Sequence, residues 1–171
     1  MTSRNPATFD ELMAWCSKTA EHWELRDGYD VPEEADDLDR WRRGEPGPDP
    51  YRDNFRPMVA AAVARGVAFR RLRVVSMPAT EYVRYEYDTT GHILDSGEQV
   101  RWIKRPDVVG LVPANDLWVF DGRFVHWGFF DPANRFTGAR IDDDTSTADV
   151  IRNAFDSVWS QATPHADFEI G

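Results

Sequence analysis

Residues 115–130 read NDLWVFDGRFVHWGFF, and we expect this stretch to decide how the rest of the chain is arranged. Two apolar runs flank Asp121-Gly122, a dipeptide that favours the tight turn of a β-hairpin. Pairing of Phe120 with Arg123 across this turn sets the predicted register. One predicted face then carries Trp118, Phe120, Arg123, Val125 and Trp127, and the other carries Leu117, Val119, Phe124, His126 and Phe130. Both faces are mostly apolar, which predicts a hairpin covered on both sides.

Further elements are predicted to alternate along the chain around this hairpin. Before it, the pattern predicts a helix over 8–19, a strand over 20–27, a polar helix within 28–53, a helix over 55–65, a strand over 67–76, a helix from Pro78 to about Tyr87, a loop from Gly91 to Gly97 and a strand over 99–104. After it, the pattern predicts a strand over 135–142 and a helix over 147–162, capped by Ser146 with Asp149. This order indicates an α/β fold whose mixed sheet is covered by helices on both faces.

The last predicted helix has the strongest amphipathic pattern in the chain. Its apolar residues recur with helical spacing at Val150, Ile151, Ala154, Phe155, Val158, Trp159 and Ala162. We therefore expect Trp159 to be buried against the hairpin, close to Trp118 or Trp127.

Residues 28–53 interrupt the pattern with a polar segment that ends in GEPGPDP (44–50). This segment predicts a linker. We expect residues 1–53 to form an N-terminal helix/strand addition with a polar linker, and residues 54–171 to form the α/β core, within one compact unit.

The composition bounds the function. The chain has 171 residues and a formal net charge of −10, which argues against extensive direct binding to nucleic acid or anionic lipid. Its single cysteine, Cys16, rules out an intramolecular disulfide or a cysteine metal cluster. The first residues lack the apolar core of a secretory signal, and no apolar run is long enough to cross a bilayer. We expect a cytoplasmic protein without a membrane association.

Charged and aromatic residues within the predicted elements are candidates for a binding site. Arg71 and Arg73 share a strand face with apolar residues, so each either pairs with a carboxylate or contacts a ligand. The candidate residues for ligand or partner binding are Arg73, Tyr82, Glu86, Arg101, Asp116 and Trp127. We predict no catalytic residues, cofactor or metal, because neither the four histidines nor Asp142–Asp144 have the spacing of a metal site.

Segments spread over nearly the whole chain resemble the actinobacterial family called DUF6879. They are EHWELRDGY (21–29), RGVAFRRLRVVSMPATEYVRYEYD (65–88), GEQVRWI (97–103), NDLWVFDGRFVHWGFF (115–130) and FDSVWSQATPHADF (155–168). Members of this family resemble proteins encoded beside helix-turn-helix regulators and small DUF397-type proteins. The resemblance implies a protein partner of one of these kinds.

The chain also resembles the phospholipase D-like fold, which actinobacterial transcription regulators carry in a degenerate form as a sensor module. These modules often end in a phenylalanine, a tryptophan and Ala-Thr-Pro, as Phe155, Trp159 and 162–164 do here. Enzymes of this superfamily carry His-x-Lys-x4-Asp and, six residues later, Gly-Ser-x-Asn. With Asp121 as the aspartate, Ala114 stands at the histidine position and Asp116 at the lysine position. Gly128 matches the glycine, and the serine and asparagine positions hold Phe129 and Asp131.

These replacements imply a phospholipase D-like half without the catalytic motif. Alanine cannot attack phosphorus, and a carboxylate at position 116 repels the phosphate that a lysine would hold. The nearby His126 is interpreted as a core or edge residue. We therefore predict a non-catalytic sensor or protein-interaction module of a transcription-regulatory system, with a homodimer as a further possibility. The alternative is an enzyme or effector that acts on a phosphate-containing or small polar ligand through an unrecognised site.

Overall fold

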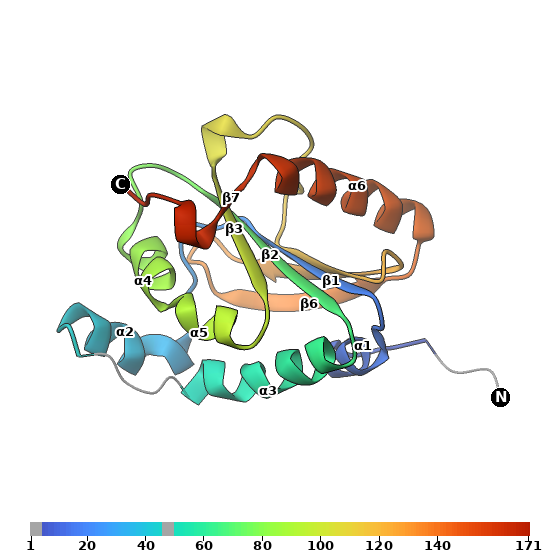
Figure 1. Cartoon of the computed structure of the whole chain (residues 1–171), viewed down its shortest axis with the longest axis horizontal. Helices are drawn as coiled ribbons and strands as arrows, with labels where there is room; N and C mark the ends of the chain where they lie inside the picture. Colours follow the sequence, from blue (N-terminus) through green and yellow to red (C-terminus); the bar gives the residue numbers. More distant parts are fainter. Residues whose placement is uncertain (1–4, 46–49) are drawn as a thin grey trace.

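The computed structural model describes residues 5–45 and 50–171, and they form an α/β fold around one twisted sheet (Figure 1). The sheet has seven strands in the order β6-β5-β4-β1-β2-β3-β7. Their bounds are β1 Thr19–Glu24, β2 Ala68–Val75, β3 Gln99–Lys104, β4 Leu117–Phe120, β5 Phe124–Phe130, β6 Phe136–Asp142 and β7 Thr163–Pro164. Strands β1, β2 and β3 are parallel neighbours, and the other pairs are antiparallel. The predicted mixed sheet is confirmed.

Strand β1 occupies the middle of the sheet. It pairs with β2 on one side and with β4 on the other. Trp23 in this strand is fully buried. This strand joins the hairpin side of the sheet to the parallel strands, so part of the predicted N-terminal segment 1–53 lies at the centre of the same sheet as residues 54–171.

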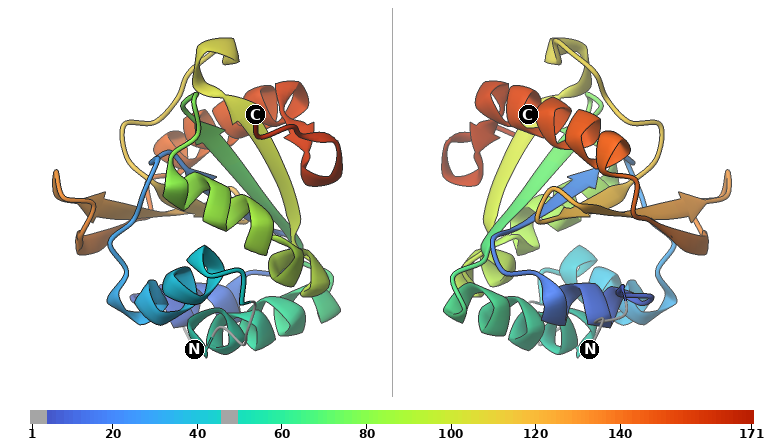
Figure 2. Two further views of the ribbon diagram at one scale, coloured as in Figure 1. Left: turned by 90° about the vertical axis from the view of Figure 1, so that its left-hand side faces the viewer. Right: turned by 90° about the vertical axis from the view of Figure 1, so that its right-hand side faces the viewer.

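Helices cover both faces of the sheet, as predicted (Figures 1 and 2). Helix α6 (Thr145–Gln161) covers one face, where it packs on β1, β4 and β5. The opposite side carries α1 Phe9–Trp15, α2 Ala35–Arg42, α3 Pro50–Ala64, α4 Glu81–Thr89 and α5 Gly91–Asp95. Short 3-10 turns occur at η1 Pro32–Glu34, η2 Arg105–Asp107 and η3 His165–Asp167.

The central hairpin is covered on both sides as predicted, but its register is shifted by one residue. Both Asp121 and Gly122 have positive φ angles, and the Arg123 amide donates to the Phe120 carbonyl at 2.9 Å, which closes the expected turn. However, Phe120 pairs with Phe124 rather than with Arg123. Because side chains alternate between the two faces, this shift turns the whole of β5 over relative to the prediction.

Contacts outside the hairpin hold its turn in place. The Asp121 carboxylate accepts hydrogen bonds from the backbone amides of Ser17, Lys18 and Thr19 at 2.8–2.9 Å. The Asp121 amide in turn donates to the Thr19 carbonyl at 2.9 Å. The turn is therefore tied to the start of β1, which local sequence patterns do not reveal.

Several predicted boundaries also differ from the structure. Helix α4 begins at Glu81 and is capped by Thr80, whereas the prediction began it at Pro78. Residues 91–95 form α5 where a loop was predicted. Helix α6 begins at Thr145, and its cap is Asp144, whose carboxylate accepts from the Ser146 amide at 2.9 Å. The centre of the predicted linker, 46–49, lies outside the described residues.

The predicted burial of Trp159 is confirmed. Its side chain is 8% exposed and belongs to the apolar cluster that α6 forms with Leu117, Val119 and Val125. Trp127 packs against the same cluster, whereas Trp118 lies in the cluster on the opposite face. In the part of the chain that the structure describes, no helix is long and apolar enough to cross a bilayer.

Candidate functional site

A cavity of about 770 Å³ lies on the side of the sheet that faces the five helices α1–α5. Strands β1, β2, β4 and β5 contribute its floor, and α4 with α5 contributes a wall. The segment from Tyr29 to Glu34 forms another part of the rim, and Phe9 and Phe55 approach from α1 and α3. This volume suits a small organic molecule.

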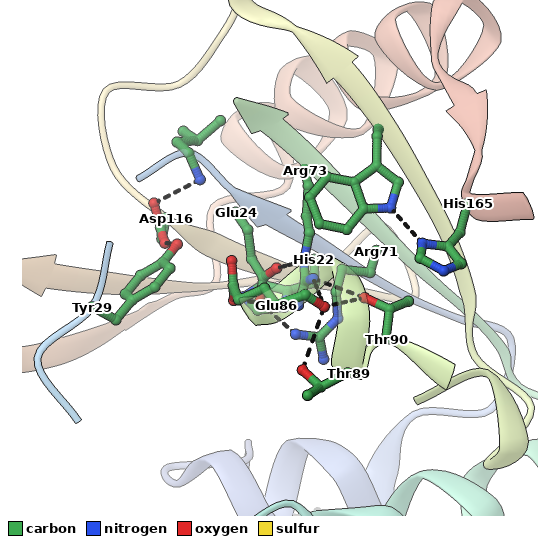
Figure 3. Close-up of polar contacts among 12 residues, drawn as sticks. His22, Glu24, Tyr29, Arg71, Arg73, Glu86, Thr89, Thr90, Asp116 and His165 are labelled. Atoms are coloured by element: carbon green, nitrogen blue, oxygen red, sulfur yellow. Dashed lines mark hydrogen bonds and ion pairs between the residues drawn. The ribbon is translucent and has the colours of Figure 1, made fainter. Parts of the chain in front are cut away.

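The floor of the cavity contains a network of buried charges from adjacent parallel strands (Figure 3). The β1–β2 register sets His22 beside Arg71 and Glu24 beside Arg73, so these alternating residues point to the same face. Glu24 accepts hydrogen bonds from both arginines. Both arginines are more than 90% buried.

Further carboxylates complete the network around the two arginines. The Arg71 Nε donates to Glu98 Oε1 at 2.6 Å. The Arg73 Nη2 lies 3.3 Å from Glu86 Oε1, and its Nη1 donates to the Thr90 hydroxyl at 3.0 Å. Both guanidinium groups are thus engaged by protein acceptors.

The two arginines keep Glu24 ionised. Burial opposes ionisation of Glu24, but the facing charges of Arg71 and Arg73 outweigh it and hold the pKa of Glu24 below its usual range. Burial raises the pKa of Glu98, and the pairing with Arg71 opposes this rise only in part. The cavity floor is therefore rigidly paired rather than presenting free cations.

A second polar pair lies at the other end of the cavity. Asp116, immediately before β4, is 6% exposed and accepts hydrogen bonds from the Leu25 amide at 3.1 Å and from the Tyr29 hydroxyl. Burial raises the pKa of Asp116 from 3.8 to about 6, and the charge of Glu24 adds to this rise. Burial likewise raises the pKa of Tyr29.

The raised pKa of Asp116 predicts a measurable pH dependence of stability. The folded state binds a proton more tightly here than the unfolded state does, so the stabilisation is complete below pH 4 and is lost as pH rises through about 6. The free energy of unfolding of Asp116→Asn, relative to the parent, should therefore rise by up to about 3 kcal/mol between pH 4 and pH 7. Urea unfolding at both pH values measures this difference. If the variant and the parent differ in free energy of unfolding by the same amount at pH 4 and at pH 7, the pKa of Asp116 is not raised by folding.

Two histidines lie on the cavity floor on either side of Trp118. The His22 ring stacks on Trp118 with ring centroids 3.9 Å apart, and His126 is the cross-strand partner of Trp118. Burial lowers the pKa of both histidines. They are neutral at pH 7 and add no positive charge to the cavity.

Four of the six candidate residues line the cavity and two do not. Arg73, Tyr82, Glu86 and Asp116 line it, from β2, α4 and the segment before β4. Arg101 lies on the α6 side, where its Nη1 donates to the Trp159 carbonyl at 2.9 Å. Trp127 also packs on that side, because the shifted register turned β5 over.

Sequence reasoning missed Glu24, Tyr29 and Glu98, which complete the cavity. The alternation of His22 and Glu24 with apolar Trp23 was visible, and it placed both polar residues on one strand face. It did not show that this strand lies next to β2. Tyr29 and Glu98 lie outside regular elements, where periodicity carries no signal.

These features define an α/β fold with a ligand-sized cavity on one side of its sheet. The chain is similar in structure to Nuc, a phospholipase D family member from Salmonella typhimurium, with a TM-score of 0.53 at 12% identity; 91% of this chain and 86% of Nuc are covered. It is also similar to TrmBL2, an archaeal chromatin protein whose structure shows a novel mode of DNA binding, with a TM-score of 0.50 at 13% identity. That match covers 90% of this chain and 48% of TrmBL2, so the chain spans about half of that protein.

The chain belongs to the family described as Domain of unknown function (DUF6879), which matches residues 7–169. No curated protein matches it.

Proposed function

We propose that this protein is a non-catalytic sensor module, which binds a small molecule in its cavity and acts through a protein partner in a transcription-regulatory system. The observation that carries the proposal is the cavity itself, about 770 Å³ in volume. Its floor is fixed by buried ion pairs, whereas part of its rim is the segment from Tyr29 to Glu34, which lies outside the sheet. A preformed floor with a separate rim suits binding and release of a ligand.

The arrangement of charges supports a non-catalytic role. A phosphodiesterase needs cations that are available to phosphate oxygens, but Arg71 and Arg73 are already engaged by Glu24. Asp116 takes the position of the lysine in the aligned motif, and its carboxylate belongs to the cavity wall. Ala114, at the histidine position, is exposed and carries no nucleophile.

A regulatory role is supported by the fold and by the charge of the chain. The similarity to TrmBL2 relates this fold to a chromatin protein that binds DNA. With a net charge of −10, this chain is poorly suited to hold DNA directly. A helix-turn-helix regulator or a small DUF397-type protein would then make the DNA contact, and a homodimer is a further candidate assembly.

Ligand binding can be tested with a variant that narrows the cavity. Gly128 lines the cavity, and a Cβ at this position would meet no atom closer than 3.5 Å, so the backbone has room for a Cβ. Circular dichroism checks that Gly128→Val, which adds two further methyl groups, is folded. A library of amines, acids, sugars and nucleotides is screened by thermal unfolding of the parent and of this variant. A ligand at about 100 times its Kd should raise the parent Tm by roughly 5–10 °C.

The control for this screen is Thr137→Val. Thr137 is exposed on the neighbouring strand β6, and the substitution also introduces a valine. We expect this control to respond like the parent and Gly128→Val to respond weakly. The sensor proposal fails if the parent responds to no compound, or if Gly128→Val responds as strongly as the parent.

The purified protein should not hydrolyse bis-p-nitrophenyl phosphate, phospholipid or nucleic acid. In the aligned motif, Ala114 stands in place of the histidine nucleophile and Asp116 in place of the lysine that binds phosphate. The assay compares the parent with His126→Ala and Asp116→Asn. Turnover lost in His126→Ala would show that the motif has been aligned incorrectly.

One observation favours the alternative function, an enzyme or effector acting on a small polar ligand. Asp116 has a pKa of about 6 and is hydrogen-bonded to Tyr29 beside the cavity, which suits a general acid or base. Turnover that survives His126→Ala but disappears in Asp116→Asn would support this alternative.

A further inference from the structure

The wall of the cavity carries an excess of negative charge. Among the residues that the structure describes, seven carboxyl groups and four arginines line it. The buried members of this set are Glu24, Glu34, Glu86, Glu98 and Asp116 on the acidic side, with Arg71 and Arg73 on the basic side. The two neutral histidines of the floor do not offset this excess.

Asp116 retains acceptor capacity toward the cavity. An ionised carboxylate has about four acceptor positions, and the hydrogen bonds from Leu25 and Tyr29 occupy two of them. Its location in the cavity wall leaves it close to a ligand. A cationic ligand could therefore pair with Asp116 without disturbing the Arg71–Glu24–Arg73 network.

Aromatic rings surround Tyr29 at this end of the cavity. The Tyr29 ring lies edge-on to Tyr82 and to Phe130, with centroid distances of 5.8 and 5.3 Å. All three residues line the cavity. Arg26 holds its guanidinium 5.3 Å from the centroid of the Phe130 ring, so this ring already takes part in one cation–π contact.

We propose that the cavity binds a small organic ammonium ion, whose charge pairs with Asp116 and whose alkyl groups pack against Tyr29, Tyr82 and Phe130. This inference rests on the proposed sensor function and names its class of ligand. Aromatic rings beside a carboxylate are groups that recognise quaternary and substituted ammonium ions.

Other classes of ligand fit the site less well. Anions would meet the carboxylate excess, and the two buried arginines are already paired. Within residues 5–45 and 50–171, the structure contains no cluster of three or more His, Cys, Asp or Glu residues able to hold a metal ion. The volume of about 770 Å³ is also far larger than a metal ion needs.

The test uses three probes that share a shape and differ in charge. Choline is the cation, 3,3-dimethylbutan-1-ol is its neutral isostere, and 3,3-dimethylbutanoate is the anion; phenyltrimethylammonium serves as a larger cation. Binding to the full chain is measured by calorimetry at pH 7.5 and low ionic strength. We expect one of the two cations to bind at least about tenfold more tightly than the neutral isostere.

Two variants separate the contributions of charge and ring. Asp116→Asn should weaken binding of the cation by about tenfold or more and leave the isostere unaffected. Phe130→Leu keeps an apolar side chain but removes the ring, and it should weaken binding of the cation by about 2- to 30-fold. Asp149→Asn, which removes an exposed carboxylate on α6, is the matched control and should bind like the parent. Circular dichroism checks that each variant is folded. If Asp116→Asn does not fold, the effect of Phe130→Leu on cation binding decides the test.

The outcomes distinguish this inference from the sensor proposal. Equal or tighter binding of the isostere or the anion overturns the ammonium class, while the cavity remains a ligand site. Failure of both cations to bind overturns it as well. If the wider library also gives no response that depends on Gly128, the sensor proposal fails with it.

Discussion

Replacing Glu24 by alanine should lower the free energy of unfolding by about 3–5 kcal/mol. Glu24 is 8% exposed and bridges Arg71 and Arg73, which come from the adjacent parallel strand. Its removal leaves two buried guanidinium groups with fewer counter-charges, and desolvated charges are costly when they lose a partner. Urea unfolding at pH 7, followed by tryptophan fluorescence, measures the change.

Glu81→Ala is the matched control for Glu24→Ala. Glu81 also pairs with an arginine, Arg42, at 2.6 Å, but both side chains are about half exposed. Water replaces the lost partner at such a site, so the unfolding midpoint should move far less than in Glu24→Ala. Equal shifts in the two variants would show that the buried network contributes no more than a surface ion pair.

Replacing Trp159 by alanine should cost a comparable 3–5 kcal/mol, for a different reason. The indole fills the space between α6 and the hairpin, where it stacks on Phe155 with centroids 5.5 Å apart. The guanidinium of Arg101 lies 4.8 Å from its ring centroid. Truncation therefore leaves a cavity and removes a cation–π contact. Because a domain is typically stable by about 5–15 kcal/mol, the variant should be marginally folded.

Trp41→Ala provides the comparison for Trp159→Ala. Trp41 lies on the polar helix α2, where it is partly exposed and its indole nitrogen donates to Asp88 at 2.9 Å. Its loss should cost much less than the loss of Trp159, as measured by thermal and urea unfolding of both variants beside the parent. If Trp159→Ala unfolds within a degree or two of the parent, α6 does not hold this core together, and Trp159 becomes a candidate contact for a partner.

The sequence itself determined the elements whose signals are local. The 3.6-residue spacing predicted α6 to within two residues at each end and most of its buried face, because one amphipathic face must be covered. Val150, which was predicted to belong to that face, is exposed. Strands β2 and β3 and helix α3 followed from short apolar runs bounded by glycine or proline. The Asp121-Gly122 turn followed from its tolerance of positive φ angles.

The candidate site depended on tertiary structure. Periodicity indicated that Arg71 and Arg73 share a strand face, and it left open whether they meet a carboxylate or a ligand. The parallel register of β1 and β2 decided this, because it sets Glu24 beside Arg73. That register joins residues 49 positions apart, and no local preference encodes it.

The hairpin shows the same division most clearly. Its existence follows from the sequence, but its register does not, because Phe120 pairs with Phe124 instead of Arg123. The Asp121 carboxylate also caps three amides of the segment before β1, a contact that joins distant parts of the chain. The observed register places Trp127 on the α6 side, away from the predicted site, and His126 on the cavity floor. A strand alternates faces at every residue, so a shift of one position moves each side chain of β5 to the other face, and the apolar pattern of the hairpin fits both registers.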